Sequence, residues 1–353
     1  MLKSEYFLWG AGTYGARLIE VMKDELRFKA VIDNDTKKQG TFFHNIPVIS
    51  YEEAKAYLPE VKIVISQAIP RKVRKFLEDE GFVQNVDFFT LFQFIPRYYW
   101  DKNKLVTQNI NATCTTACNM RCSSCQFYGH IAKTHRHLSS DEIQSDFDLL
   151  FKHIDYVMEI PICTGESLLN AEVAADACSY VYENYKDRYY VLSIVTNGSV
   201  IPSDEVMRSF TKSKTVISIS AYPKNSNTMQ ALINKCKEFG VSHLLNTTCN
   251  VDNWHDFGDP RTLSIAVPTQ LSDGCWTAAQ GLLDGWLYMC SIQAYAQEIV
   301  GIGSIQPGDA FDLRHPVSDE SRKEVYRIIS AQPEKGYVSH CTRCYGMLNP
   351  LMK

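Results

Sequence analysis

The chain has 353 residues, a formal net charge of −4 and a hydrophobic fraction of 45%. These values are typical of a globular protein with two or three domains, and the small negative charge excludes the basic footprint of a nucleic-acid binder. Charges interrupt the apolar runs before they reach the length of a membrane span, and the first residues form no secretory leader, so we expect a cytoplasmic protein without membrane contact.

The N-terminal part of the chain predicts a Rossmann-like domain over residues 1–97. A buried strand leads into a turn that carries Gly10, Gly12 and Gly15 and opens an amphipathic helix. The next strand ends at Asp33, where a dinucleotide-binding unit places the acid that holds a ribose. The expected strands cover residues 6–9, 28–32, 47–49 and 62–66, and the expected helices cover residues 16–26, 51–58 and 71–80.

NAD binding does not follow from this pattern, because a dinucleotide is held across two mononucleotide halves and this segment has room for a single one. Residues 31–40 and 46–50 resemble small Rossmann-like domains attached to enzymes of sugar and surface-polysaccharide biosynthesis. The resemblance implies that the glycine turn holds a nucleotide phosphate at a helix N-terminus. A module used only for packing or assembly is the alternative, and the sequence leaves both open.

The stretch that organises the rest of the chain carries three close-set cysteines. Cys118, Cys122 and Cys125 follow a strand in a Cys-x3-Cys-x2-Cys spacing. Three such thiolates suit three corners of a 4Fe-4S cluster whose fourth iron stays open. The alternative is a zinc knuckle that takes His130 or His135 as its fourth ligand. Twelve cysteines in a chain without a secretory leader favour metal binding over disulfides.

The segment from Thr115 to Cys125 resembles the cluster loop of the radical S-adenosylmethionine (radical SAM) superfamily. In that family the open iron binds the amino and carboxylate groups of the methionine moiety, and an electron from the cluster releases a 5′-deoxyadenosyl radical. The residue before the last cysteine is usually aromatic and packs near the adenine, whereas here it is Ser124. The resemblance therefore implies that Phe127 or Tyr128 takes over the adenine packing.

After a polar linker at residues 98–104, strands and helices alternate over residues 105–270, which predicts parallel strands with right-handed crossovers. A helix over residues 140–153 starts with a capping box formed by Ser139 and Glu142. Six strand and helix units match the partial (β/α)6 barrel of the radical SAM family, so the expected fold class is α/β. The expected strands cover residues 106–113, 156–162, 190–196, 216–221, 242–248 and 263–267.

Polar residues at the C-terminal ends of these strands are the expected cofactor ligands, because active sites of such barrels lie there. Thr164, Gly165 and Glu166 end the second strand and resemble the Gly-Gly-Glu motif that receives the methionine ammonium, with threonine in place of the first glycine. Asn197 after the third strand and Ser218 on the fourth resemble positions that hydrogen-bond the ribose and methionine groups. An asparagine-glycine pair is also an ordinary turn signal.

A second cysteine set lies in residues 271–353. Cys275 and Cys290 flank an Asp-Gly hairpin turn, and Cys341 and Cys344 follow as a Cys-x2-Cys pair. This pattern resembles the short twitch form of the SPASM-like auxiliary-cluster domain, which implies a second, fully ligated 4Fe-4S cluster. Four thiolates also suit structural zinc, and the sequence does not separate the two.

Together these features predict a three-part radical SAM enzyme with two 4Fe-4S clusters, which abstracts hydrogen from a carbon of a free or nucleotide-linked sugar. A second cluster that accepts an electron favours oxidation to a carbonyl. Cys249, after the fifth strand, is instead the candidate hydrogen donor of an epimerase. A peptide-modifying maturase and a non-catalytic scaffold with two zinc sites are further alternatives. The resemblance also implies a reductant such as flavodoxin or ferredoxin as a partner.

Overall fold

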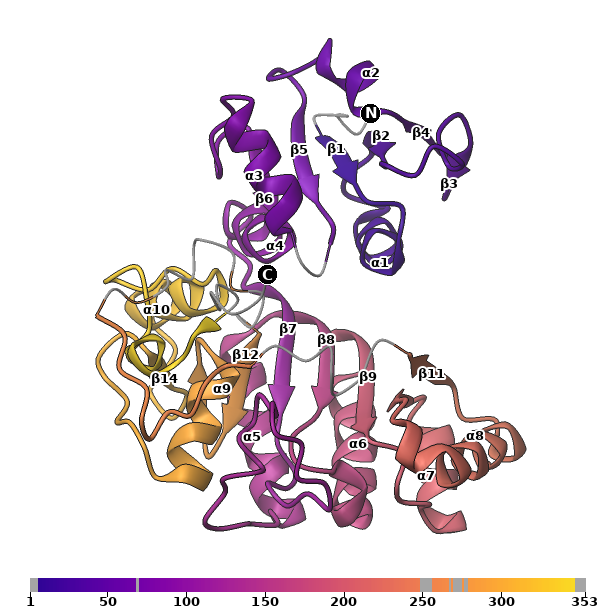
Figure 1. Cartoon of the computed structure of the whole chain (residues 1–353), viewed down its shortest axis with the longest axis vertical. Coiled ribbons are helices and arrows are strands. Elements are labelled where there is room, and N and C mark those ends of the chain that lie inside the picture. The colour runs from indigo at the N-terminus through magenta and orange to yellow at the C-terminus, as the bar shows by residue number, and fades with distance from the viewer. Residues whose placement is uncertain are drawn as a thin grey trace. The chain divides into compact units, whose positions relative to one another are not determined.

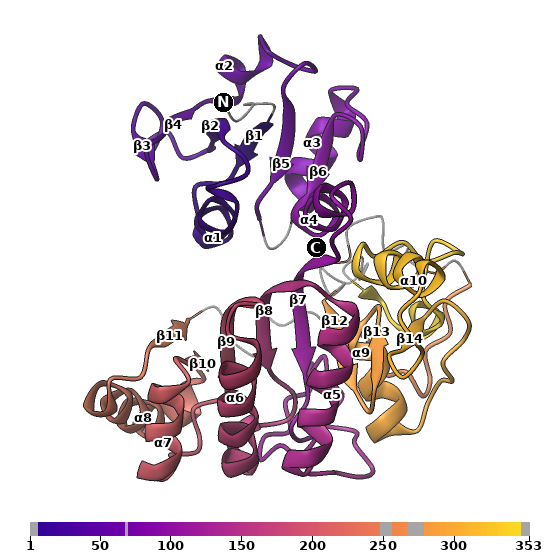
Figure 2. The same cartoon turned by 180° about the vertical axis from the view of Figure 1, so that it is seen from behind.

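The computed structural model describes residues 6–67, 70–247, 256–266, 268, 275 and 279–346. The chain divides into two compact units, Met1–Lys102 and Asn103–Lys353, and each has its own sheet (Figures 1 and 2). Both units are α/β, as the sequence predicts. Within the described residues, no helix is both long enough and apolar enough to cross a membrane.

The sheet of the first unit has the order β3-β4-β2-β1-β5-β6, and its strands are parallel except for β3, which runs antiparallel to β4. The expected strands at 6–9, 28–32, 47–49 and 62–66 are confirmed to within a residue or so. The strands are β1 (Tyr6–Trp9), β2 (Phe28–Ile32), β3 (Phe42–Phe43), β4 (Ile46–Ile49), β5 (Lys62–Ile65) and β6 (Phe88–Thr90). The helices are α1 (Thr13–Met22), α2 (Tyr51–Lys55), α3 (Arg71–Asp79) and α4 (Leu91–Trp100).

The sequence did not predict β6 and α4. Proline usually breaks a helix, but Pro96 lies within α4, whose start is fixed by a capping box between Thr90 and Gln93. The last turn of α4 occupies part of the expected linker. The Tyr98 hydroxyl donates to the Glu25 carbonyl oxygen at 3.3 Å, so this turn packs on the first unit.

The second unit contains a sheet of the order β11-β10-β9-β8-β7-β12-β13-β14. Helices alternate with β7 to β11, and Figure 2 shows α5 and α6 covering one face of the sheet. The strands are β7 (Val106–Ala112), β8 (Tyr156–Ile162), β9 (Tyr189–Thr196), β10 (Val216–Ser220), β11 (His243–Asn246), β12 (Gln280–Leu283), β13 (Trp286–Tyr288) and β14 (Ala310–Asp312). The α-helices are α5 (Ser140–His153), α6 (Ala171–Tyr185), α7 (Asp204–Lys212), α8 (Ser226–Phe239), α9 (Ser291–Tyr295) and α10 (Asp319–Ile329).

The sixth parallel strand does not lie where the sequence predicts it. Residues 263–266 form no strand, and the Ile265 amide instead donates to the Thr342 carbonyl oxygen at 2.8 Å. β12 is parallel to β7, at the opposite side of the sheet from β11. The described strands β7 to β12 thus form an open parallel sheet without barrel closure, which the antiparallel strands β13 and β14 extend.

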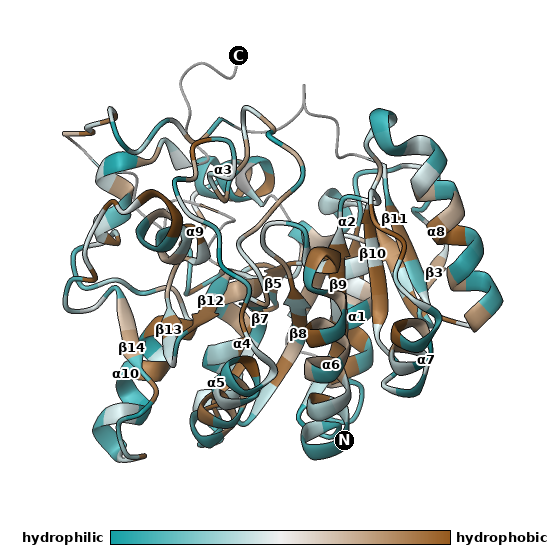
Figure 3. Cartoon of the chain, turned by 90° about the horizontal axis from the view of Figure 1, so that it is seen from below, coloured by the Kyte–Doolittle hydropathy of each residue, from teal (hydrophilic) through white to brown (hydrophobic). Residues whose placement is uncertain are grey.

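The two faces of this sheet differ in polarity. Ile217 and Ile219 are fully buried, and Ile219 lies beside Met229 of α8, so their face is the one that the helices cover. Figure 3 shows the brown, hydrophobic strands β9 and β10 beside helices that are teal on their outer sides. Ser218 and Ser220 alternate with the isoleucines and are partly exposed on the other face.

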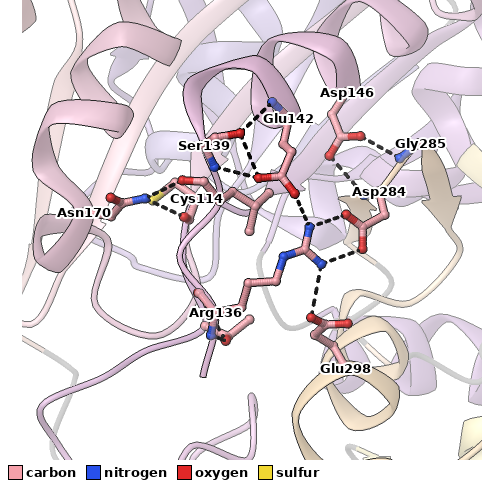
Figure 4. A network of polar contacts seen from close by, with 11 residues as sticks. Cys114, Arg136, Ser139, Glu142, Asp146, Asn170, Asp284, Gly285 and Glu298 are labelled. Atoms are coloured by element: carbon pink, nitrogen blue, oxygen red, sulfur yellow. Dashed lines mark hydrogen bonds and ion pairs between the residues drawn. The ribbon is translucent and has the colours of Figure 1, made fainter. Parts of the chain in front are cut away.

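A charged network joins the loop after β7 to the β12–β13 hairpin (Figure 4). The Arg136 guanidinium donates to both carboxylate oxygens of Asp284, at 2.6 and 2.9 Å. It also donates to Glu142 in the predicted capping box of α5, at 2.9 Å, and to Glu298, at 3.2 Å. The hairpin itself, with its turn at Asp284 and Gly285, confirms the Asp-Gly prediction.

Asp146 on α5 holds the same turn from its buried side. Its carboxylate accepts from the Gly285 amide at 2.6 Å and from the Asp284 amide at 3.1 Å. Burial nevertheless raises the pKa of Asp146 from 3.8 to about 7, which outweighs the two amide donors. The hairpin therefore depends on a carboxyl group that changes its charge near neutral pH.

We predict that Asp146 makes the protein less stable as the pH rises from about 4 to about 7. Its folded-state pKa lies above 3.8, so folding takes up a proton in this window and the favourable contribution is lost as the pH rises through the folded pKa. Asp146→Asn should remove this dependence, a change of up to about 4 kcal/mol between the two ends of the window. The measurement is the free energy of unfolding of both proteins against pH.

Asp141→Asn serves as the matched control, because it removes one formal charge at an exposed position of the same helix. A difference between wild type and Asp146→Asn that does not vary between pH 4 and 8 would contradict the assignment.

Candidate functional site

The three-cysteine loop follows β7 and lies at the C-terminal end of the parallel strands. Cys118, Cys122 and Cys125 are all partly exposed free thiols. The Cys118 sulfur accepts from the Met120 amide at 3.4 Å, and the Cys125 amide donates to the Cys122 carbonyl oxygen at 3.1 Å. Each sulfur is close enough to influence another electrostatically, because Cys118 and Cys122 both act on the pKa of Cys125.

The end of β8 is joined directly to the backbone of this loop. The Thr164 hydroxyl donates to the Thr115 carbonyl oxygen at 2.8 Å, and the Glu166 amide donates to the Ala117 carbonyl oxygen at 2.7 Å. Gly165, between them, has φ +52°, and a Cβ at this position would lie 2.1 Å from the Ala117 oxygen. No side chain fits there, so glycine is what allows the turn and the cysteine loop to touch.

Thr164 has a φ of +154°, a region that glycine adopts and other residues rarely do. This strain agrees with the resemblance in sequence, in which threonine replaces a glycine of the motif. Its buried hydroxyl bond to Thr115 is the contact that holds the strained residue in place.

Glu166 is completely buried and its carboxylate accepts three hydrogen bonds from the chain. The donors are the Thr196 hydroxyl at 2.6 Å, the Asn197 amide at 2.6 Å and the Leu168 amide at 3.1 Å. Burial raises the pKa of Glu166, although these donors oppose the rise. Among the described residues, no lysine or arginine forms an ion pair with it. A carboxylate accepts about four hydrogen bonds, so one position is left for a further donor.

An amide network connects the cysteine loop to the ends of β9 and β10. The Asn197 side chain donates to the Asn119 side chain at 3.0 Å and lies 3.9 Å from the Cys118 sulfur. Asn225, after β10, donates to the Asn197 carbonyl oxygen at 2.8 Å. The Asn119 side chain in turn donates to the Ser199 hydroxyl at 2.7 Å. The sequence singled out Asn197 but missed Asn119 and Asn225, because a lone asparagine in a loop carries no pattern.

Ionisation of the loop thiols is unfavourable without a cation. Burial raises the pKa of Cys125 to about 11, against amide donors from Gly129 and Phe127, and burial also raises the pKa values of Cys118 and Cys122. A bound metal deprotonates such thiols outright. Three neighbouring thiols with amide donors aimed at their sulfurs fit the cluster that the sequence predicts.

Within the described residues, no three cysteine, histidine or acidic side chains lie close enough together to hold a single metal ion. A cubane cluster binds each thiolate to a different iron, so its ligands lie farther apart than those of one ion. Of the two histidines considered as zinc ligands, His135 lies 3.3 Å from the Thr116 carbonyl oxygen. A ring nitrogen of His130 is buried and has no hydrogen-bond partner in the described part of the chain.

In the second cysteine set, Cys290 and Cys344 are buried, whereas Cys275 and Cys341 are partly exposed. Cys275, Cys290 and Cys344 all act electrostatically on Cys341, but among the described residues no three of these sulfurs lie close enough together to hold a single metal ion. Burial raises the pKa of Cys290 to about 12, and it raises those of Cys341 and Cys344 further. The buried Asp309 carboxylate positions this set, because it accepts from the Gln293 side chain at 2.8 Å and the Ser339 amide at 2.9 Å.

In the first unit, Gly10, Gly12 and Gly15 form the expected turn at the start of α1. A Cβ on Gly15 would lie 2.4 Å from the Gly10 carbonyl oxygen, so the helix packs closely on the strand. The Asp33 carboxylate accepts from the Ala11 amide at 2.9 Å. It also accepts from the Asp35 amide and pairs with Lys38, so despite partial burial its pKa is lowered. These bonds pair the Asp33 carboxylate within the chain, so its position does not require a bound nucleotide.

Three further residues are candidates for the site from the sequence. Ser218 lies on the polar face of the sheet, in register with Val195 of β9. Tyr128, expected beside the adenine, is 1% exposed, and its hydroxyl bonds His340. Cys249 lies outside the described residues.

Neither a family model nor a curated protein sequence matches the chain. Among solved structures, it is similar to BtrN in complex with AdoMet and 2-DOIA, with 14% identity over 69% of this chain and 94% of that one and a TM-score of 0.41. Native anSMEcpe with bound AdoMet has 17% identity over 41% of this chain and a TM-score of 0.32. The match spans 47% of anSMEcpe, about half its length.

HydG, a maturase of the FeFe-hydrogenase, has 12% identity over 68% of this chain and 53% of that one, with a TM-score of 0.32. Two of these three structures hold AdoMet. Similarity at this level does not assign an activity to the chain.

We predict that Gly165→Ala displaces the cysteine loop. The new methyl group would collide with the Ala117 oxygen, and alanine is strained at φ +52°. The matched control is Gly240→Ala after α8, where φ is +69° but nothing lies within 4 Å. The control should lose about 1 kcal/mol of stability. Gly165→Ala should lose clearly more and, after anaerobic reconstitution, bind less iron, as measured by urea unfolding and iron analysis. Equal losses in both variants would show that the contact with Ala117 is unimportant.

Proposed function

We propose that this chain is a radical SAM enzyme that oxidises an alcohol carbon of a carbohydrate-type substrate to a carbonyl. The observation that carries the proposal is the junction between the cysteine loop and the Thr164–Glu166 turn. The loop with the three thiols and the Glu166 carboxylate meet at the ends of β7, β8 and β9. A 4Fe-4S cluster on these thiolates would leave one iron open to the α-amino and α-carboxylate groups of an amino acid such as methionine.

The residues at this junction have separate tasks in the proposal. Cys118, Cys122 and Cys125 hold a 4Fe-4S cluster, which when bound supplies the electron that cleaves S-adenosylmethionine to a 5′-deoxyadenosyl radical. Glu166 offers its remaining lone pair to an N–H of the methionine amino group, which the open iron would bind. Asn197 fixes the distance between the loop and β9 through its bond to Asn119.

The polar face of the sheet supports a substrate with several hydroxyl groups. Interiors of such barrels are usually filled by branched apolar side chains. Here register pairs place Asn109 beside Glu159, Glu159 beside Val191, and Val195 beside Ser218. Asn109, Glu159 and Ser218 are partly exposed, and the buried Asn109 side-chain oxygen has no hydrogen-bond partner among the described residues. A hydroxyl group of a sugar would bond this oxygen, whereas an apolar substrate would leave it unpaired.

The second cysteine set supports oxidation. Four thiolates ligate a 4Fe-4S cluster fully and leave no iron open to substrate, so its role would be to accept an electron. Oxidation of an alcohol removes one hydrogen atom from carbon, one proton from the hydroxyl group and one electron. Structural zinc is the alternative occupant of this set, and it could not take up the electron.

Epimerisation is the second candidate function, because Cys249 follows the last residue of β11, Asn246, closely in the sequence. A thiol there would return a hydrogen atom to the substrate radical. A peptide substrate is a further alternative to a sugar. A one-electron donor such as flavodoxin or ferredoxin would serve all three reactions.

We predict that the product is lighter than the substrate by two hydrogens and that Cys249→Ala keeps turnover. Anaerobic protein is incubated in deuterated water with dithionite, S-adenosylmethionine and, in turn, UDP-glucose, GDP-mannose and the free hexoses. Mass spectrometry then reports the product. A product one mass unit heavier than the substrate, with one deuterium on carbon, that is not formed by Cys249→Ala would replace oxidation by epimerisation. Glu166→Gln is the comparison variant, and it should raise the KM for S-adenosylmethionine about tenfold or more through loss of one charge-assisted bond.

A further inference from the structure

A carboxylate lies on the polar face of the second sheet, in the middle of a central strand. Register pairs Ser218 of β10 with Val195 of β9. It pairs Val191, four residues earlier on the same face, with Glu159 of β8. On its other side, Glu159 lies beside Asn109 of β7. All five side chains are partly exposed, so Glu159 belongs to the open face and not to the one that the helices cover.

Neither Asn109 nor Glu159 is a residue that the sheet itself requires. Both lie in strands with a neighbouring strand on either side, where asparagine and, to a lesser degree, glutamate are uncommon. The residues before and after Glu159, Met158 and Ile160, are apolar and buried, as packing against helices demands. The buried Asn109 side-chain oxygen has no hydrogen-bond partner among the described residues. The pair is therefore better explained by a polar ligand than by folding.

Glu159 is the only carboxylate that the described strands β7 to β11 place on this face. Tyr189, at the start of β9, is the other titratable side chain that the register of these strands places there. Burial raises the pKa of the Tyr189 hydroxyl, so this group keeps its proton near neutral pH. Carboxylates act as general bases in enzymes. Within these strands, Glu159 is thus the side chain suited to take a proton from a ligand on this face.

Glu159 also lies on the strand that leads to the proposed cofactor site. β8 ends at Ile162, and the Thr164–Glu166 turn that bonds the cysteine loop follows it. Glu159 precedes Ile162 by three residues, which is about 10 Å along a strand. A substrate on the polar face would therefore lie between the ends of the strands, where the radical is proposed to form, and the Glu159 carboxylate.

We propose that Glu159 is the catalytic base of the oxidation and takes the hydroxyl proton of the substrate. The inference rests on the proposed function and names a further residue for it. The C–H bond breaks homolytically, and its hydrogen atom completes the methyl group of 5′-deoxyadenosine. The O–H bond breaks heterolytically, its proton moves to a Glu159 carboxylate oxygen, and the remaining electron passes to the cluster on the second cysteine set as the C=O bond forms.

Proton removal makes the loss of the electron easier. Loss of an electron from a neutral hydroxyalkyl radical leaves a positively charged, protonated carbonyl group. If the proton leaves first, the radical is an anion and gives up its electron much more readily. A positioned general base contributes about 100-fold or more to such a step. Abstraction of the hydrogen atom precedes this step and does not need the base.

The test separates hydrogen abstraction from oxidation in the full-length, anaerobically reconstituted protein. The probe is UDP-glucose, GDP-mannose or a free hexose, whichever the wild type oxidises, deuterated on its sugar carbons. Deuterium in 5′-deoxyadenosine and in re-formed S-adenosylmethionine reports abstraction, and carbonyl product reports oxidation. Glu159→Gln keeps the size of the side chain but is no base. We expect it to keep deuterium transfer within about twofold of wild type and to lower the yield of carbonyl product about 100-fold.

Three variants are compared with Glu159→Gln. Glu159→Asp keeps a carboxylate and should restore part of the oxidation. Asn109→Ala removes a neighbour that would contact the same sugar but takes up no proton, so it should raise the KM and leave the ratio of carbonyl product to transferred deuterium unchanged. Glu172→Gln removes one formal charge at an exposed position of α6 and should change neither yield.

The ratio of the two yields separates failure of this inference from failure of the proposed function. If Glu159→Gln lowers both yields by the same factor, Glu159 only binds the substrate, and if it changes neither yield, Glu159 has no role in the reaction. Either result overturns the inference while the enzyme proposal stands. If wild-type protein forms no carbonyl product from any of these sugars, with or without deuterium transfer, the proposed oxidation and the inference fall together.

Discussion

The buried Glu166 carboxylate is the constraint on which the rest of the site depends. Removing a carboxylate from water costs several kcal/mol unless hydrogen bonds and charges compensate it. Leu168, Thr196 and Asn197 supply three of these bonds, and the last two are available only when β9 ends beside the turn that follows β8. The amide of the same residue is bonded to the cysteine loop at Ala117. One residue therefore fixes three segments that are distant in sequence, and one acceptor position of its carboxylate remains.

The two cysteine sites form one packed region of the second unit. Tyr128 and Phe127 connect the first loop to the helices of the second set, while Arg136 connects the same loop to the β12–β13 hairpin that leads to Cys290. The proposed oxidation takes up one electron at its start and releases one at its end. Contacts between the two cysteine sites would hold both at fixed positions relative to the polar face of the sheet. At the glycine turn of the first unit, by contrast, the Asp33 carboxylate already has partners within the chain. It accepts from the Ala11 amide and pairs with Lys38.

Much of the fold and some of the site could be predicted from the sequence, and the failures have physical causes. Strands β7 to β10 were predictable because buried apolar runs and capping signals such as Ser139 with Glu142 are local. The position of β12 could not be predicted, because β12 pairs with β7, which is distant from it in the sequence. Tyr128 has the aromatic character expected of an adenine neighbour, but only tertiary packing shows that it contacts His340. The roles of Asn119 and Asn225 could not be predicted either, because both bond Asn197, which is distant from them in the sequence.

Reductive cleavage of S-adenosylmethionine tests the central claim most directly, because it requires the first cluster, its open iron and the Glu166 junction together. Anaerobically reconstituted protein should contain two 4Fe-4S clusters, about eight irons per chain, and form 5′-deoxyadenosine after reduction with dithionite. Replacement of Cys118, Cys122 and Cys125 by alanine should leave about four irons and form none. Wild-type protein that binds zinc instead of iron, or that binds iron but forms no 5′-deoxyadenosine, would contradict the proposed radical chemistry.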